Sequence, residues 1–166
     1  MIISLIAAVS KNNVIGVDGD LPWSLPADMK FFSKTTRGHH VLMGRKNFDS
    51  IPERFRPLPS RPNIVVTRNG SFTAEGVIVC NSIEAGIAHA EQAGEEELFI
   101  IGGGDIYKQC LSIADRLYIT HVNTVIEGDA FFPAFDPSDW EQEVLIEHPI
   151  DDVHNFSFEV CLYRKK

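Results

Sequence analysis

The sequence predicts an α/β fold in which a single domain, residues 1–166, contains a mostly parallel central sheet of about eight strands. We expect about four flanking helices and an antiparallel hairpin at the C-terminal edge of the sheet. Two observations predict this arrangement. Short apolar runs alternate with helix-length segments as far as residue 122, and two strand-like runs then follow with little helix between them. A chain of 166 residues is also long enough for one domain with a sizeable core.

The first half of the chain alternates strands and helices. Residues 2–9 are almost entirely apolar and predict a buried strand, which is followed by a long connection over residues 10–24. A connection of this length inside a compact domain is usually functional and often forms a lid. The elements expected next are a helix over 25–36 with Pro26 in its first turn, a strand over 40–43 and a brief helix over 45–50.

The second half continues the alternation and then ends in strands. A proline-rich connection over residues 52–62 is too short and stiff to link two domains. Ser82 is placed to cap a helix over 83–93, and Gly94 is placed to end it. The remaining predicted elements are a helix over 105–111 and strands over 63–67, 76–80, 98–101, 116–122, 141–148 and 156–163.

Composition and charge argue against several classes of protein. The formal net charge of −8 argues against a general nucleic-acid surface. No apolar run is long enough to span a bilayer, and residues 2–9 lack the basic start and cleavage site of a signal peptide. The 3 cysteines are odd in number and form no C-x-x-C pair, which indicates reduced thiols and a cytoplasmic location.

Positive charge is concentrated between residues 45 and 68, where six cations accompany two acids and give a local charge of +4. The rest of the chain therefore carries −12. Two of the cations begin the brief helix over 45–50 and oppose its macrodipole, so a bound phosphate would compensate them. The segment indicates either a binding region for an anionic small molecule or a solvated loop.

Asp28 is a carboxylate among apolar and aromatic residues, and on a helix it shares one face with Phe32. One interpretation is a solvated first-turn acid, because acids favour helix N-termini. The other is a carboxylate that points into a binding cleft. The sequence around Asp28 leaves both interpretations open.

Several features fall at or just beyond the carboxyl ends of predicted strands, where ligands bind in open α/β sheets. They are Ala8, Gly44, Thr67, Arg68 and the glycine triplet at 102–104. The triplet does not match G-x-G-x-x-G, and by itself it favours a plain tight turn. Its position between an apolar strand and a helix also suits a phosphate-binding turn. The shared location predicts that these features form one site.

Short motifs occur in a fixed order along the chain: ISLIAA (3–8), VIG (14–16), LPW and LPAD (21–28), MGR (43–45), RPLP (56–59), IGGG with IY (101–107), LYITH (117–121) and EGD (127–129). With them the chain resembles bacterial dihydrofolate reductase over essentially its whole length. The resemblance implies NADPH-dependent reduction of 7,8-dihydrofolate to tetrahydrofolate for one-carbon metabolism. Hydride would pass from the nicotinamide to pterin C6, and a proton would be added at N5. It further implies that antifolate inhibitors bind. A monomer is the simplest expectation, and we expect no nucleic-acid or membrane partner.

The resemblance assigns catalytic roles to Asp28, Trp23, Thr120 and Leu21. Asp28 would hold the amidine-like edge of the pterin, and Thr120 would hydrogen-bond that carboxylate. Trp23 would hold a water, and Leu21 would gate a mobile lid over residues 16–21. Burial would raise the pKa of Asp28 while hydrogen bonds to its ionised form would lower it, and the sequence leaves this balance open.

The resemblance also implies the substrate contacts. Phe32, Ile51 and Leu58 would grip the aminobenzoyl ring of the substrate. Arg61 would bind the glutamate tail, with Arg56 as a weaker neighbour, because a guanidinium can bind a carboxylate bidentately. The full substrate set is Ile6, Asp28, Phe32, Ile51, Arg56, Leu58, Arg61, Ile101 and Thr120.

For NADPH, the resemblance places Arg45, Thr67 and Arg68 at the 2′-phosphate and Lys46 and Asn47 beside the pyrophosphate. Close approach to the pyrophosphate would explain the glycine triplet, and family members carry a cis peptide between its first two residues. The full cofactor set is Ala8, Ile15, Gly16, Gly44, Arg45, Lys46, Asn47, Thr67, Arg68, Gly102, Gly103, Gly104, Asp105, Ile106, Tyr107 and Gln109.

Two departures from the family pattern affect these assignments. The segment over residues 52–56 is longer than in the family pattern, which leaves the placement of Arg54 and Arg56 open. Asp105 stands where some relatives carry a base. We expect it either to cap the helix or to repel a nearby phosphate and lower cofactor affinity.

Two alternative functions remain at this point. One is an NADPH-dependent pyrimidine reductase of riboflavin synthesis, and the other is a folate- or nucleotide-binding module without turnover. The LPAD motif and the segment over 56–61 favour folate over the pyrimidine. Retention of Asp28, Trp23 and Thr120 together argues against the module. The 6 histidines show no ligand spacing, so we expect no metal site.

Overall fold

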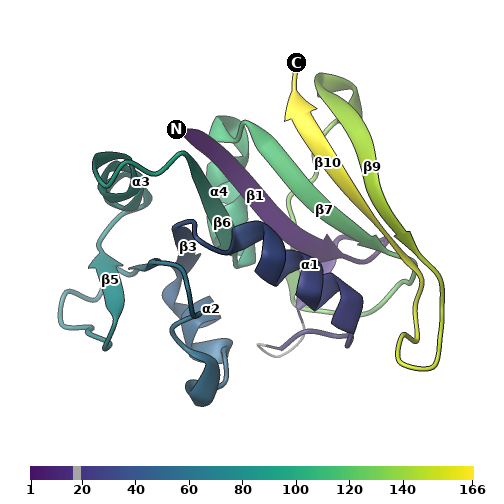
Figure 1. Cartoon of the computed structure of the whole chain (residues 1–166), viewed down its shortest axis with the longest axis horizontal. Coiled ribbons are helices and arrows are strands. Elements are labelled where there is room, and N and C mark those ends of the chain that lie inside the picture. The colour runs from purple at the N-terminus through teal and green to yellow at the C-terminus, as the bar shows by residue number, and fades with distance from the viewer. Residues whose placement is uncertain (17–19) are drawn as a thin grey trace.

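The computed structural model describes residues 1–16 and 20–166. Within them, the main sheet has eight strands in the order β5-β4-β3-β6-β1-β7-β10-β9 (Figure 1). Its strands are β1 (Ile2–Val9), β3 (Val41–Gly44), β4 (Asn63–Val66), β5 (Val77–Cys80), β6 (Glu97–Gly102), β7 (Arg116–Val122), β9 (Trp140–His148) and β10 (Phe158–Lys165). The first six pair in parallel, whereas β10 runs antiparallel to both β7 and β9. The predicted α/β architecture with a C-terminal antiparallel hairpin is confirmed.

Local sequence signals explain where the helices begin and end. The helices are α1 (Pro26–Thr36), α2 (Arg45–Ser50), α3 (Ile83–Gln92) and α4 (Gly104–Cys110). As predicted, the Ser82 side chain caps α3 by accepting from the Ala85 N–H. Gly94, just past the end of α3, has a φ of 81°, the left-handed conformation that favours glycine.

Some predicted boundaries were wrong. The connection over residues 10–24 contains a short strand, β2 (Val14–Gly16), which pairs with β8 (Ala130–Phe131). Neither strand gave a sequence signal because each is very short and its partner is distant in the chain. Three 3₁₀ turns were also missed, at Glu53–Phe55, Leu111–Ile113 and Pro137–Asp139. The last strand begins at Phe158 instead of residue 156, since its pairing with β7 starts there.

Alternating side chains give the sheet two apolar faces. Leu5 packs in a cluster with Ala90 of α3 and Ile106 of α4, whereas its neighbour Ile6 packs in another cluster with Phe31 of α1. Figure 1 shows α1 lying across β1 and β7. Helix α1 therefore covers one face of the sheet near its centre, and α3 and α4 cover the other.

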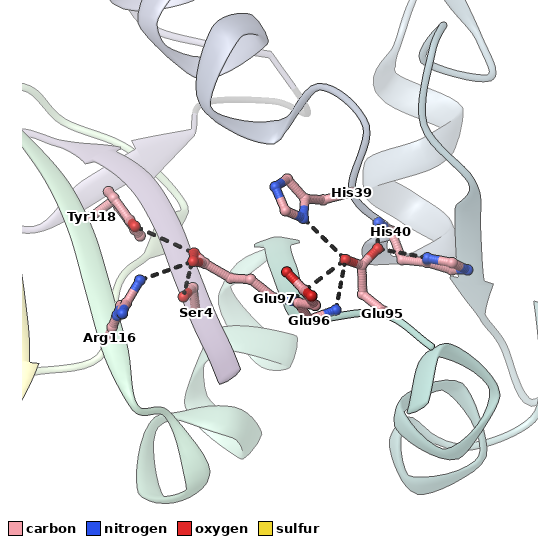
Figure 2. Close-up of polar contacts among 8 residues, drawn as sticks. All are labelled: Ser4, His39, His40, Glu95, Glu96, Glu97, Arg116 and Tyr118. Atoms are coloured by element: carbon pink, nitrogen blue, oxygen red, sulfur yellow. Dashed lines mark hydrogen bonds and ion pairs between the residues drawn. The ribbon is translucent and has the colours of Figure 1, made fainter. Parts of the chain in front are cut away.

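The amino ends of the strands carry a polar network (Figure 2). The Glu95 carboxylate lies between the rings of His39 and His40, 2.9 and 2.7 Å from their Nδ1 atoms. Nearby, Glu97 accepts from Arg116 at 2.9 Å and from the Tyr118 hydroxyl at 3.2 Å. These acids therefore lie at the edge opposite the strand ends that were predicted to bind ligand.

Candidate active site

The Asp28 carboxylate is bound by a residue distant in sequence. The hydroxyl of Thr120, on β7, donates to Asp28 Oδ1 at 2.6 Å. Thr120 is 3 % exposed, and Asp28 is half-buried in the first turn of α1. The first-turn acid is therefore not a solvated surface residue, and a binding cleft beside Asp28 stays a prediction.

Burial decides the protonation behaviour of this carboxylate. Desolvation raises the pKa of Asp28 above its ordinary value, and the hydrogen bond from Thr120 lowers it by a smaller amount. The net direction is upward. The sequence left this direction open, because the burial of Asp28 depends on how α1 packs on the sheet.

The ends of neighbouring strands bring the predicted features into one row. Ala8 of β1 pairs with Thr120 of β7, and Met43 of β3 pairs with Gly102 of β6. Gly44 ends β3, and a Cβ added to it would lie 3.1 Å from Ile106 of α4. Thr67 and Arg68 follow directly after β4. The carboxyl ends of the strands thus meet as predicted.

All five apolar residues assigned to the substrate belong to one hydrophobic cluster. Ile6 and Met43 are buried in it, and the partly buried residues packed against them include Phe31, Phe32, Ile51, Leu58 and Ile101. Trp23 packs on a neighbouring cluster with Leu25 and Val122. This cluster therefore joins the apolar face of α1 at Phe31 and Phe32 to Ile51 and Leu58 and forms an apolar wall there.

Arg61 is a buried cation whose described partners are all neutral. Its guanidinium donates to the Thr36 hydroxyl and the Pro59 carbonyl at 2.8 Å each, and to the Ser33 hydroxyl at 3.5 Å. The residue is 9 % exposed. Burial, together with the charge of Arg37, lowers the pKa of Arg61. A bound carboxylate would relieve this unfavourable setting.

The Arg56 side chain binds the end of α2. Its Nη1 donates to the carbonyls of Asp49 at 2.9 Å, Ile51 at 3.3 Å and Phe48 at 3.4 Å. In the lengthened segment, Arg54 stacks on Phe55 at 4.6 Å. The placement left open by the sequence is thus resolved, and among the described contacts Arg56 stabilises a helix terminus.

The three consecutive glycines at positions 102, 103 and 104 differ in what surrounds them. Gly102 has a φ of 118°, and a Cβ on it would lie 3.1 Å from the Tyr107 ring. A Cβ on Gly104 would lie only 2.7 Å from the Phe131 carbonyl oxygen. At Gly103 a Cβ would meet nothing within 4 Å. Packing inside the protein therefore explains two of the three glycines, a correction to the single explanation by pyrophosphate; the predicted cis peptide between Gly102 and Gly103 is present.

The residues that begin α4 differ in part from the expectation. Gly103 is the N-cap and makes no side-chain cap bond, so Asp105 does not cap the helix. Asp105 instead accepts from Gln109 at 2.9 Å. The hydroxyl of Tyr107 donates to the Ile6 carbonyl at 2.6 Å, and burial strongly raises its pKa. Tyr107 therefore lies in the core beneath the strand ends.

Two of the cations assigned to the cofactor, Arg45 and Lys46, begin α2. Arg45 packs over the Phe72 ring at 4.3 Å and pairs with Asp49 at 3.4 Å. The N-cap of α2 is Gly44, and its first turn holds no acid. Lys46 follows Arg45 on α2, and the Asn47 amide lies 3.5 Å from the Ile101 carbonyl.

The predicted lid falls partly on residues that the structure does not describe. Residues 17–19 lie outside the described chain, so the lid over 16–21 is not placed. Gly16 ends β2, and its carbonyl accepts from the Asp129 N–H at 3.1 Å. Ile15 packs against the large core cluster, whereas Leu21 is 51 % exposed.

Sequence reasoning missed three polar residues that hold the site. The buried Asn63 amide binds the backbone of both Leu58 and Arg61. Buried Thr36 accepts from Arg61, and His154 accepts from the Ala27 N–H beside Asp28. An asparagine that opens a strand after a proline-rich loop was a usable signal for Asn63, but nothing local pointed to the other two.

Among the described residues, His148, Asp151 and His154 lie with ligand atoms within 4.8 Å of one another, which the absence of ligand spacing did not anticipate. Hydrogen bonds account for the group. His154 Nδ1 lies 2.8 Å from Asp151, and its Nε2 accepts from Ala27. His148 Nδ1 donates to the Pro149 carbonyl. Both nitrogens of His154 are thus engaged, and a metal would have to displace one of these partners.

Comparison with known proteins gives consistent matches. The family model described as dihydrofolate reductase matches residues 2–165. The type 3 dihydrofolate reductase of Salmonella typhimurium is 44 % identical and covers 100 % of both chains. The dihydrofolate reductase of Bacillus subtilis is 42 % identical over 99 % of this chain and 95 % of its own. A solved structure, dihydrofolate reductase from Enterococcus faecalis complexed with NADP(H) and RAB-propyl, superposes with a TM-score of 0.90 at 35 % identity, covering 99 % and 96 % of the two chains.

Proposed function

The chain belongs to the dihydrofolate reductase family, and on that premise we propose that Asp28, Thr120 and the row of strand ends beside them are its active site. The enzyme is an oxidoreductase that reduces dihydrofolate with NADPH. The roles of individual residues below are part of the proposal.

One observation carries the assignment, the half-buried Asp28 carboxyl bonded to Thr120 at 2.6 Å. Asp28 Oδ1 accepts a hydrogen bond from the Thr120 hydroxyl. The carboxyl can also bind the amidine-like edge of a pterin with paired hydrogen bonds. Because burial raises its pKa, this carboxyl holds a proton at higher pH than an exposed aspartate would. That property suits a reaction in which the pterin must gain a proton at N5.

The residues at the strand ends fit NADPH, which when bound supplies the hydride. Helices α2 and α4 both begin at glycines without a side-chain cap, so their first backbone N–H groups remain for an outside acceptor. The first turn of α2 holds Arg45 and Lys46 and no acid. These donors and charges suit phosphate, and Gly103 leaves space for a close approach. Asp105, an acid in the first turn of α4, opposes phosphate binding at that helix start.

The rest of the site fits the two other parts of a folate. Phe32, Ile51 and Leu58 offer an apolar wall for the aminobenzoyl ring. The Arg61 guanidinium, held by Thr36 and the Pro59 carbonyl, is oriented for the carboxylate of the glutamate tail. Antifolate inhibitors would use the same carboxylate and wall.

We further infer that residues 1–166 act as one domain, because one main sheet includes both β1 and β10, and that the protein is a monomer. The thiols of Cys80, Cys110 and Cys161 are free, which supports a reducing, cytoplasmic setting. Among the described residues, no helix is long and apolar enough to cross a membrane.

The experiment follows NADPH absorbance after dihydrofolate is added, with wild type, Asp28→Asn and the exposed control Asp139→Asn. We expect wild-type turnover and a loss of about 100-fold or more in hydride transfer for Asp28→Asn at neutral pH. Partial recovery is expected in acid, where dihydrofolate is already protonated. Tight binding of both ligands by wild type without NADPH consumption would support a non-catalytic module, and unchanged kinetics in Asp28→Asn would remove its role.

A further inference from the structure

The first turn of α1 lacks the usual side-chain cap. Its N-cap residue is Leu25, whose side chain offers no acceptor, and Pro26 has no N–H. The N–H groups of Asp28 and Met29 both donate to the Leu25 carbonyl at 3.0 Å. The Ala27 N–H is therefore the donor in this turn that needs an acceptor from elsewhere.

His154, in the connection between β9 and β10, provides that acceptor. Its Nε2 lies 3.1 Å from the Ala27 nitrogen, although the two residues are 127 positions apart. The His154 side chain is buried, and its ring packs near Phe158 with centroids 5.9 Å apart. A buried imidazole thus joins this connection to the residue that precedes Asp28.

Asp151 fixes which nitrogen of His154 carries the proton. Asp151 Oδ1 lies 2.8 Å from His154 Nδ1, and it also accepts the backbone N–H groups of Val153 at 3.0 Å and His154 at 2.9 Å. These bonds keep the carboxylate ionised and lower the pKa of Asp151, the His154 side chain contributing most. An ionised carboxylate only accepts, so Nδ1 holds the proton and Nε2 is free to accept.

We propose that His154, oriented by Asp151, is a positioning residue that fixes the first turn of α1 and thereby holds the Asp28 carboxylate against Thr120. The inference rests on the proposed function of Asp28. The first turn is held at two points, through the Asp28 side chain to Thr120 of β7 and through the Ala27 N–H to His154 in the connection between β9 and β10. Without the second tie, the turn can open and admit water to the carboxylate.

The test measures single-turnover hydride transfer from NADPH to dihydrofolate against pH. His154→Phe keeps a ring of similar size without an acceptor, whereas the Oε1 of His154→Gln can replace Nε2. Val153→Ala, an exposed site in the same connection, is the matched control. We expect His154→Phe to slow the step about fivefold to tenfold at neutral pH and to lower its apparent pKa, because Asp28 becomes more hydrated. His154→Gln should recover most of the rate and most of the apparent pKa of the step, and Val153→Ala should match wild type in both.

Equal losses in His154→Phe and His154→Gln with an unchanged pH profile would reduce His154 to a structural role and overturn the proposal. So would a wild-type profile in a folded His154→Phe enzyme. If that variant does not fold, ¹⁵N chemical shifts of the His154 ring in wild type decide the matter, since a proton on Nε2 at neutral pH contradicts the acceptor. Absence of wild-type turnover would instead refute the proposed function.

Discussion

At the scale of single residues, the Asp28 carboxyl lies between two opposing influences on its pKa. Burial raises that pKa, and the Thr120 hydroxyl lowers it. Because Thr120 is buried on β7, an interior strand of the sheet, its hydrogen bond is shielded from competing water. Thr120 therefore adjusts the acidity of Asp28 as well as its orientation.

Thr120→Val should raise the apparent pKa of hydride transfer by about one unit, because it removes a bond to the ionised form while keeping the shape of the side chain. The measurement is the single-turnover rate against pH. Exposed Thr73→Val serves as control. A downward shift would mean that the hydroxyl stabilises the protonated carboxyl instead.

A second residue-scale prediction concerns Arg61, whose planar guanidinium is set by Thr36 and Pro59. Arg61→Lys should raise KM for dihydrofolate by about tenfold, since an ammonium cannot bind a carboxylate through two parallel bonds. KM for NADPH should not change. Steady-state kinetics test this, with Arg37→Lys as the neighbouring exposed control. Equal changes in both KM values would place Arg61 outside the substrate site.

At the scale of elements, adjacent glycines in the turn from β6 into α4 serve different purposes, one for packing and one for binding. Gly104 approaches the β8 backbone at Phe131, whereas Gly103 faces open space. The same residue type therefore serves two purposes at adjacent positions, and a substitution at each should show which purpose it serves.

Gly104→Ala should destabilise the protein by about 1–3 kcal/mol, because the added Cβ meets a backbone oxygen that cannot move aside. Gly103→Ala should leave stability unchanged and weaken NADPH binding. Urea unfolding and cofactor titration distinguish the two outcomes. A stability loss in Gly103→Ala equal to that in Gly104→Ala would contradict the assignment.

At the scale of the whole molecule, the carboxyl ends and the amino ends of the parallel strands carry different polar groups. The carboxyl ends gather cations, glycines and one carboxyl with a raised pKa, whereas the amino ends hold Glu95 and Glu97 in hydrogen-bond networks (Figure 2). Burial alone would raise the pKa of Glu95, but bonds from the His40 backbone, both histidine rings and the Glu97 backbone lower it to about 2. The hydrogen bonds to Glu95 at the amino ends of the strands therefore stabilise the fold.

This predicts a specific acid dependence of stability. Because the folded-state pKa of Glu95 lies below its ordinary value of 4.5, its contribution is complete above pH 4.5 and is lost as the pH falls toward 2. Glu95→Gln should cost about 2 kcal/mol of unfolding free energy at pH 7, and the difference from wild type should shrink below pH 4.5. Denaturant unfolding across pH tests this, with exposed Glu96→Gln as control. A difference that does not vary with pH would show that the charge of Glu95 contributes nothing.

The sequence by itself determined the order of the main-sheet strands and the four α-helices, the convergence of ligand-binding features at the strand ends and the resemblance to dihydrofolate reductase. These depend on local patterns such as apolar runs, helix caps and ordered motifs, and each is complete within a few neighbouring residues. Only the tertiary structure decided the direction of the Asp28 pKa, the turning of Arg56 toward α2 and the contact of His154 with Ala27. Each of these depends on burial or on a partner distant in the chain, and such distances are set by the packing of the whole sheet, which no local pattern contains.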